Sequence, residues 1–214
     1  MGLKHALDAD HVVAVSTIAS QVKNLKCSSM LGIFWGIGHT ATLFFISLLV
    51  LLFKINIPIS FSLLFEFLVG IMLIILGINT LRKIFKEKIH LHTHKHKATY
   101  HLHLHKHELS SSHNHAHKSF FIGMVHGLAG SAALMLLVLT TVKSTFEGLI
   151  YVTIFGIGSI TGMFLASMAI GVPFVITKKF TSFEKDIKII AGSASIIMGG
   201  IIIYEISYKN GLLF

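Results

Sequence analysis

Two imidazoles and two carboxylates stand close together near the start of the sequence, as His5, Asp8, Asp10 and His11. At about 100° per residue on a regular helix, Asp8 falls between the two histidines within an arc of about 120°. Asp10 points elsewhere, so it either orients a histidine or ligates from an unwound turn. Imidazole suits nickel, cobalt, zinc and copper, whereas carboxylates alone suit magnesium or calcium. The mixture predicts a transition-metal site, and the alternatives are a proton relay or polar residues that pair with each other between helices.

Two further histidines lie in glycine-rich apolar stretches, as Gly36-Ile-Gly-His39 and His126-Gly-Leu-Ala-Gly. Each alone could be a histidine satisfied between two helices. Glycines let neighbouring helices close on a small ion, and an internal repeat of the sequence, described below, gives His126 the place that His5 has in the first half. We therefore include His39 and His126 among the candidate metal ligands. A ligating histidine needs its other ring nitrogen oriented. The candidates for that role are Asp8, Asp10 and the hydroxyls of Thr40, Thr42 and Ser131.

A histidine-rich stretch separates two apolar halves. Residues 86–118 hold eleven of the fifteen histidines of the chain. They are His90, His92, His94, His96, His101, His103, His105, His107, His113, His115 and His117. Histidine tracts bind several borderline metals with little selectivity. We interpret this stretch as an auxiliary metal-binding linker, a collector or sensor and not the transport site. The alternative is a solvated connector with an incidental bias.

The elements that position these residues are apolar. The chain is 53% hydrophobic and 13% charged, with a mean hydropathy of +0.77, whereas soluble domains carry about 25% charged residues. Five runs are long enough to cross about 30 Å of hydrocarbon. They are residues 31–53, 59–81, 120–142, 148–177 and 187–208. We expect a sixth span at residues 2–22, with an interfacial amphipathic helix as the alternative, because ionisable groups at membrane depth are tolerated facing a cavity.

The two halves of the chain repeat each other. Residues 2–9 align with 123–130, residues 35–39 with 155–159, and Gly70…Gly77 with Gly192…Gly199, at offsets of 121, 120 and 122. Three spans in each half force the second half to enter from the opposite side, and such inverted repeats place their site at the midplane. We therefore expect an all-α integral membrane protein of about six transmembrane helices. Its parts are a first three-helix repeat (1–85), a linker (86–118) and a second three-helix repeat (119–214).

Charge predicts the orientation of the spans. The formal net charge is +9, and Lys and Arg are far richer on the side of the linker, which the positive-inside rule places in the cytosol. Both termini then lie outside. A basic balance can also mean nucleic acid, but here the basic residues sit between apolar runs, so we expect the lipid bilayer and a divalent metal ion as partners and no nucleic acid.

The segment from His5 to His11 resembles the His-x4-Asp-His signature of the nickel/cobalt transporter family. The chain is most similar to the smaller UreH-type permeases of that family, which Gly36–Thr40 and His126–Ser131 also match. The resemblance implies a multi-pass permease that takes up Ni²⁺ or Co²⁺ across the cytoplasmic membrane of a prokaryote. It implies His5, Asp10 and His11 as the residues essential for transport, with Asp8 in the same motif and His39 and His126 beside them. Cytosolic nickel chaperones of urease or hydrogenase maturation are the further partners that we expect.

Three other functions stay open. The first is efflux on the same scaffold, although the related efflux proteins carry His-Gly-Leu-Glu-Pro-Gly-His and Pro-Cys-Pro, and this sequence has neither. The second is a membrane metal-binding accessory or sensor protein without transport. The third is a membrane metalloenzyme that activates water, but no Glu base stands beside a histidine pair. We expect no enzyme and no catalytic cofactor, with the metal as the transported substrate.

Overall fold

The computed structural model describes residues 1–22, 24–53, 58–86, 112–142, 144–177 and 181–209, and the side chains of 86, 112–115, 131–141 and 181–182 lie outside the description. Every regular element in these ranges is a helix. The helices are α1 (Gly2–His5), α2 (Ala9–Ala19), α3 (Leu25–Phe53), α4 (Ile59–Lys86), α5 (Ser112–Thr141), α6 (Thr145–Thr177) and α7 (Thr181–Tyr204), and a π-helical turn, η1 (Glu205–Lys209), continues α7.

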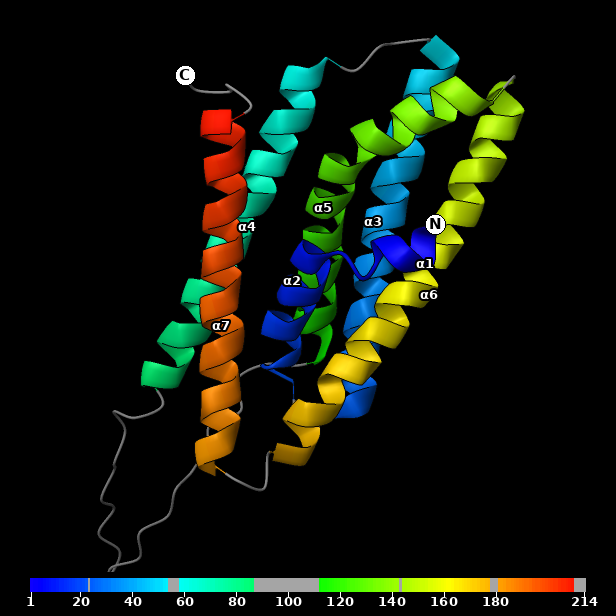
Figure 1. The fold of residues 1–214 in the computed structure, drawn as a ribbon. Helices are drawn as coiled ribbons and strands as arrows, with labels where there is room; N and C mark the ends of the chain where they lie inside the picture. Colours follow the sequence, from blue (N-terminus) through cyan, green and yellow to red (C-terminus); the bar gives the residue numbers. More distant parts are fainter. Residues whose placement is uncertain (23, 54–57, 87–111, 143, 178–180, 210–214) are drawn as a thin grey trace, which may run out of the picture.

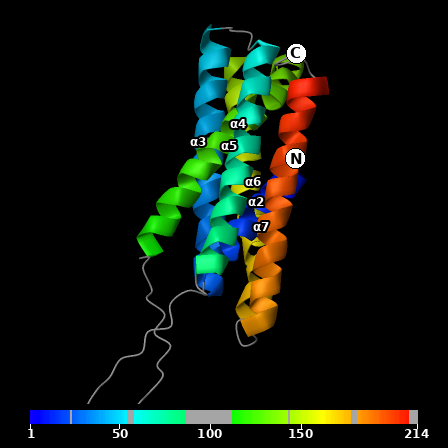
Figure 2. The ribbon, with the colours of Figure 1, turned by 90° about the vertical axis from the view of Figure 1, so that its left-hand side faces the viewer.

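The long helices run side by side as one bundle (Figure 1). Helices α3, α4, α6 and α7 are each long and apolar enough to cross a membrane. This confirms the predicted all-α membrane fold. Helix α5 has 30 residues, but part of it lies outside the described side chains, so the count of six spans stays a prediction. Figure 2 shows that the beginning of α5 leans away from the other helices.

The first segment differs from a continuous span over residues 2–22. Helix α1 ends at His5 and α2 begins only at Ala9, with Asp8 in an extended conformation before it. The 11 residues of α2 rise about 16 Å, roughly half of the hydrocarbon thickness. Nor is this segment an interfacial helix, since Ala14 and Ile18 are buried and α2 contacts α4, α6 and α7. The segment therefore enters the bundle at mid-height (Figure 1).

Corresponding helices of the two halves run in opposite directions. In Figure 1, α3 rises and its counterpart α6 descends. Likewise α4 descends and α7 rises, and α2 descends and α5 rises. We call the end where α3 stops and α4 starts the Phe53 end, and the end where α3 starts the Leu25 end. An inverted repeat requires these opposed directions, and a parallel repeat would give equal ones. The inverted repeat stays our interpretation, which the directions support.

Close contacts between helices come in pairs that the repeat relates. A Cβ atom built at Gly2 would collide with the carbonyl oxygen of Phe155, and one at Gly123 would collide with that of Trp35. The alignment matches Gly2 with Gly123 and Phe155 with Trp35. Glycine is needed at both positions because the backbones of the two helices touch there. These two crossings seat α1 against α6 and α5 against α3, which positions the histidines described next.

Candidate metal centre

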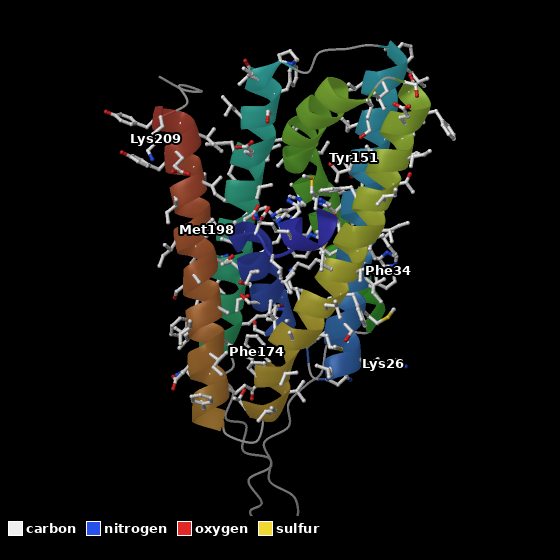
Figure 3. All side chains as sticks on the ribbon, turned by 45° about the vertical axis from the view of Figure 1, so that its right-hand side comes forward. Lys26, Phe34, Tyr151, Phe174, Met198 and Lys209 are labelled. Carbon is white, nitrogen blue, oxygen red and sulfur yellow. The ribbon has the colours of Figure 1, made fainter. Side chains whose placement is uncertain are left out.

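The break between α1 and α2 brings the first two histidines together. On a continuous helix, the separation of His5 and His11 would place about 9 Å of axial rise between them. In the structure their ring centroids lie 4.7 Å apart, because the chain is unwound between His5 and Ala9. Figure 3 shows side-chain nitrogen and oxygen atoms gathered beside this break, midway along the bundle. His11 of the first segment is therefore buried in the interior, with His5 and Asp10 partly buried beside it.

His39 of α3 and His126 of α5 complete the cluster. Their exposed fractions are 0% and 2%, and that of His11 is 2%. The ring of His39 lies 5.2 Å from that of His5 and 5.4 Å from that of His11, between centroids, while the rings of His11 and His126 are 4.5 Å apart. Four imidazoles from three parts of the chain thus converge in the middle of an apolar bundle.

The possible ligand atoms form two groups that share one histidine. One group holds ligand atoms of His5, His11 and His39 within 4.8 Å of one another, and the other does so with Asp10, His11 and His126. Around an ion with bonds of about 2.1 Å, ligand atoms lie at most about 4.2 Å apart. Small side-chain movements would therefore bring either group to bonding distance of one ion. His11 is the residue that the two groups have in common.

Two carboxylates orient the first two imidazoles. The Nδ1–H of His5 donates to Asp8 Oδ2 at 2.8 Å, and the Nδ1–H of His11 donates to Asp10 Oδ1 at 3.0 Å. The same Asp10 oxygen accepts the backbone N–H of His11 at 2.9 Å, and its other oxygen lies 3.3 Å from Nε2 of His126. A proton on Nδ1 leaves the lone pair on Nε2, which is the arrangement that metal-ligating histidines show.

Several buried ring nitrogens have no hydrogen-bond partner in the described part of the chain. They include Nε2 of His11, both ring nitrogens of His39 and Nδ1 of His126. An unsatisfied buried polar atom costs about 1 to 3 kcal/mol, so a set of them in one place is unfavourable unless something binds there. Neutral imidazoles offer lone pairs, and a cation is the ligand that accepts several of them at once.

Two residues beside the cluster were not among the candidates from the sequence. Trp35 is 1% exposed, and its ring lies 5.1 Å from that of His126 and 6.2 Å from that of His11. A Cβ atom at Gly130 would lie 3.6 Å from Nε2 of His5, so the missing side chain keeps space open next to a ligand atom. Trp35 lies one turn before His39 on α3 and so shares a helix face with it. This spacing is the feature of the sequence that could have placed the tryptophan beside the cluster.

The remaining predicted residues lie elsewhere or outside the description. Asp8 belongs to neither ligand group, and its carboxylate accepts a hydrogen bond from His5. The hydroxyl of Thr40 donates to the backbone carbonyl of Gly156 on α6, and that of Thr42 donates to the carbonyl of Gly38 within α3, so neither of these hydrogen bonds orients an imidazole. The side chain of Ser131 and those of the linker histidines from His90 to His115 lie outside the described part, and His117 is exposed near the start of α5.

Comparison with known proteins gives two matches. A family model described as the cytochrome C biogenesis protein transmembrane region matches residues 14–201. The urease accessory protein UreH of Bacillus sp. (strain TB-90) is 40% identical over 212 residues, which cover 99% of this chain and 91% of that protein. No solved structure matches the chain. The family model begins after His11, whereas the match to UreH spans almost the whole chain and thus most of the cluster.

Proposed function

We propose, on the premise that this chain belongs to the family of the urease accessory protein UreH, that it is a permease for divalent transition-metal ions. The resemblance to UreH-type permeases predicted this family. In the proposed function, the permease takes up Ni²⁺ or Co²⁺ across the cytoplasmic membrane. The observation that carries this proposal is the convergence of His5, His11 and His39 in mid-bundle, with buried ring nitrogens that lack partners.

The donor set favours a transition metal over other cations. Imidazoles outnumber carboxylates in both ligand groups, whereas Mg²⁺ and Ca²⁺ prefer all-oxygen sites. A proton relay would join its members by hydrogen bonds, but both ring nitrogens of His39 lack such a bond among the described residues. The resemblance to the nickel/cobalt transporters narrows the ion to Ni²⁺ or Co²⁺.

The position of the cluster favours transport over static binding. Many transporters bind their ion near the midplane, at discontinuous helices between two repeats. Here the ligands lie at the break between α1 and α2, and they come from the first half of the chain together with α5 of the second half. An ion at this place is roughly equidistant from both ends of the bundle, so a small rearrangement of the halves could open it to either side.

The charges of the helix ends support inward movement. Basic residues gather at the Leu25 end of the bundle, which the positive-inside rule assigns to the cytosol together with the histidine linker. They are Lys26, Arg82, Lys83, Lys118 and Lys188. A membrane potential of 100 mV, negative inside, favours entry of a divalent ion by about 4.6 kcal/mol. The linker and then cytosolic nickel chaperones would receive the ion.

The test is uptake of radioactive nickel into liposomes that contain the purified protein, under an imposed inside-negative potential. We expect saturable uptake by the wild type, and a loss of at least about a hundredfold for His11→Ala, because the ion sheds water only where fixed ligands replace it. The matched control is His117→Ala, which removes an exposed histidine near the start of α5. Normal uptake by a stably inserted His11→Ala protein would refute the proposal.

A further inference from the structure

Helix α4 carries one carboxylate that the cluster does not include. Glu66 is the only acidic residue between Ile59 and Lys86, and the first basic residue of the helix is Arg82. The span around Glu66 has a mean hydropathy of 2.6. An ionisable residue at membrane depth is costly and is retained where it faces a bundle interior or a cavity. The position of Glu66 therefore calls for a partner or a ligand.

The carboxylate lies on the interior face of α4. Glu66, Val69 and Leu73 share one face at helical spacing, and the last two are 2% and 0% exposed. Val69 and Leu73 belong to the same buried cluster as Ala14 of α2. Asp10 stands one turn before Ala14, as Glu66 stands one turn before Val69, and α2 and α4 descend together (Figure 1).

Glu66 thus lies near the histidine cluster, on the side of the Phe53 end. Helix α4, which carries Glu66, contacts α2, which carries Asp10. The partner that the described residues offer Glu66 is the hydroxyl of Ser62, which donates to its Oε1 at 3.4 Å. No Lys, Arg or His of the described part forms an ion pair with it. A half-buried carboxylate with one weak partner is free to bind a cation.

The other half of the chain has a neutralised pair at the matching place. The offset of 122 that aligns the paired glycines of α4 and α7 also matches Ser62 with Glu184 and Glu66 with Lys188. Lys188 Nζ donates to Glu184 Oε1 at 2.6 Å. Because α4 and α7 run in opposite directions, this ion pair lies toward the Leu25 end at a depth that corresponds to Glu66. The bundle therefore offers an uncompensated carboxylate at the Phe53 end and an ion pair at the other.

We propose that Glu66 is a staging site where a divalent metal ion pauses on its way from the Phe53 end to the histidine cluster. The inference rests on the proposed transport function and adds an acidic position to the route. The carboxylate attracts the hydrated ion into the apolar bundle and holds it on α4, before the ion reaches the imidazoles that replace its water. Since the matching place toward the Leu25 end is neutralised, capture is favoured at the Phe53 end.

The test separates capture of the ion from its retention. Nickel uptake into liposomes is measured against nickel concentration for the wild type, Glu66→Gln and Glu66→Asp, with Glu205→Gln as the control. Glu205 is an exposed carboxylate in η1 at the same end of the bundle and pairs with Lys209. We expect Glu66→Gln to raise the KM for Ni²⁺ about tenfold with kcat within about twofold, since an acidic cleft raises capture rates by at least that factor. Glu66→Asp restores most of the loss, and Glu205→Gln behaves as the wild type.

Equilibrium binding of Ni²⁺ to the purified proteins completes the test. An ion that reaches the histidine cluster through a staging site also leaves through it, so the loss of that site slows loading and release by the same factor. We therefore expect the Kd of the histidine cluster to stay within about twofold in Glu66→Gln. An unchanged KM in Glu66→Gln would overturn the inference and leave the permease intact. A tenfold weaker Kd would also overturn it, by making Glu66 a ligand of the cluster. Absence of nickel uptake by the wild type would instead refute the transport function itself.

Discussion

Asp10→Asn should weaken metal binding far more than Asp8→Asn, although both carboxylates contact a histidine. Asp10 accepts two hydrogen bonds from His11 and lies 3.3 Å from a nitrogen of His126. Asparagine has nearly the same shape and keeps an oxygen for the same bonds. The substitution therefore removes the negative charge and leaves the packing of the site in place.

The size of the effect follows from burial and from the number of bonds. Hydrogen bonds to a charged group contribute about 1.5 to 3 kcal/mol, against about 1 kcal/mol for neutral ones. Losing the charge at two bonds, beside an imidazole that must carry a share of the ion's positive charge, costs about 1 to 3 kcal/mol. This corresponds to a roughly fivefold to 150-fold weaker affinity, which includes the tenfold to hundredfold range found when the partner of a ligating histidine is removed. The side chain of Asp8 is 51% exposed, against 27% for Asp10, so solvent screens its charge and we expect less than about fivefold for Asp8→Asn.

The assay is equilibrium dialysis of Ni²⁺ against purified protein that lacks residues 90–117, so that the linker does not mask the cluster. Thermal unfolding of each variant checks that the bundle is intact. Equal affinities for the two variants, or a larger loss for Asp8→Asn, would contradict the assignment of Asp10 as the residue that orients His11. Loss of the folded bundle in Asp10→Asn would make the carboxylate structural.

Three further results are expected. Gly123→Ala should destabilise the bundle by about 1 to 3 kcal/mol, the usual cost of overpacking, because its Cβ would collide with a carbonyl of α3. The measurement is a thermal melt, and the control is Gly200→Ala, whose Cβ would have nothing within 4 Å. Gly130→Ala should keep the melting temperature and weaken Ni²⁺ affinity at least about tenfold in dialysis, because the methyl group fills the space beside His5 that a further ligand of the ion needs. Deletion of residues 90–117 should leave liposome uptake within about twofold and reduce the nickel retained by cells, because the linker offers many equivalent histidines and lies outside the predicted spans. Complete loss of uptake would place the transport site in the linker.

The long helices were predictable because uninterrupted apolar runs specify them directly. Lipid leaves a chain no alternative to satisfying its backbone groups internally, so residues 31–53 and 59–81 predicted helices that the structure gives as α3 and α4. The first segment was not predictable in the same way. No proline or glycine interrupts residues 3–22 to mark a break, and the break there depends on α1 crossing α6 at Gly2, which is a tertiary contact.

The same limit applies to the candidate site. Residue types and spacing selected His5, Asp10 and His11, and the repeat added His126, but only the crossing of α3 and α5 decides that these rings meet. Trp35 and Gly130 were missed because an apolar ring and an absent side chain carry no chemical signal of their own. Glu66 was different: a single carboxylate inside an apolar run was visible in the sequence, and its cost at membrane depth was the available signal.

The central claim is that the buried imidazoles hold the transported ion in mid-bundle. Crystals of the protein soaked in Ni²⁺, with diffraction recorded at the nickel absorption edge, test it most directly. The account predicts one strong anomalous peak next to Nε2 of His11, within bonding distance of His5 and His39 or of His126, and its loss in His11→Ala. Peaks confined to the linker, or a peak at the bundle surface with the cluster empty, would contradict it.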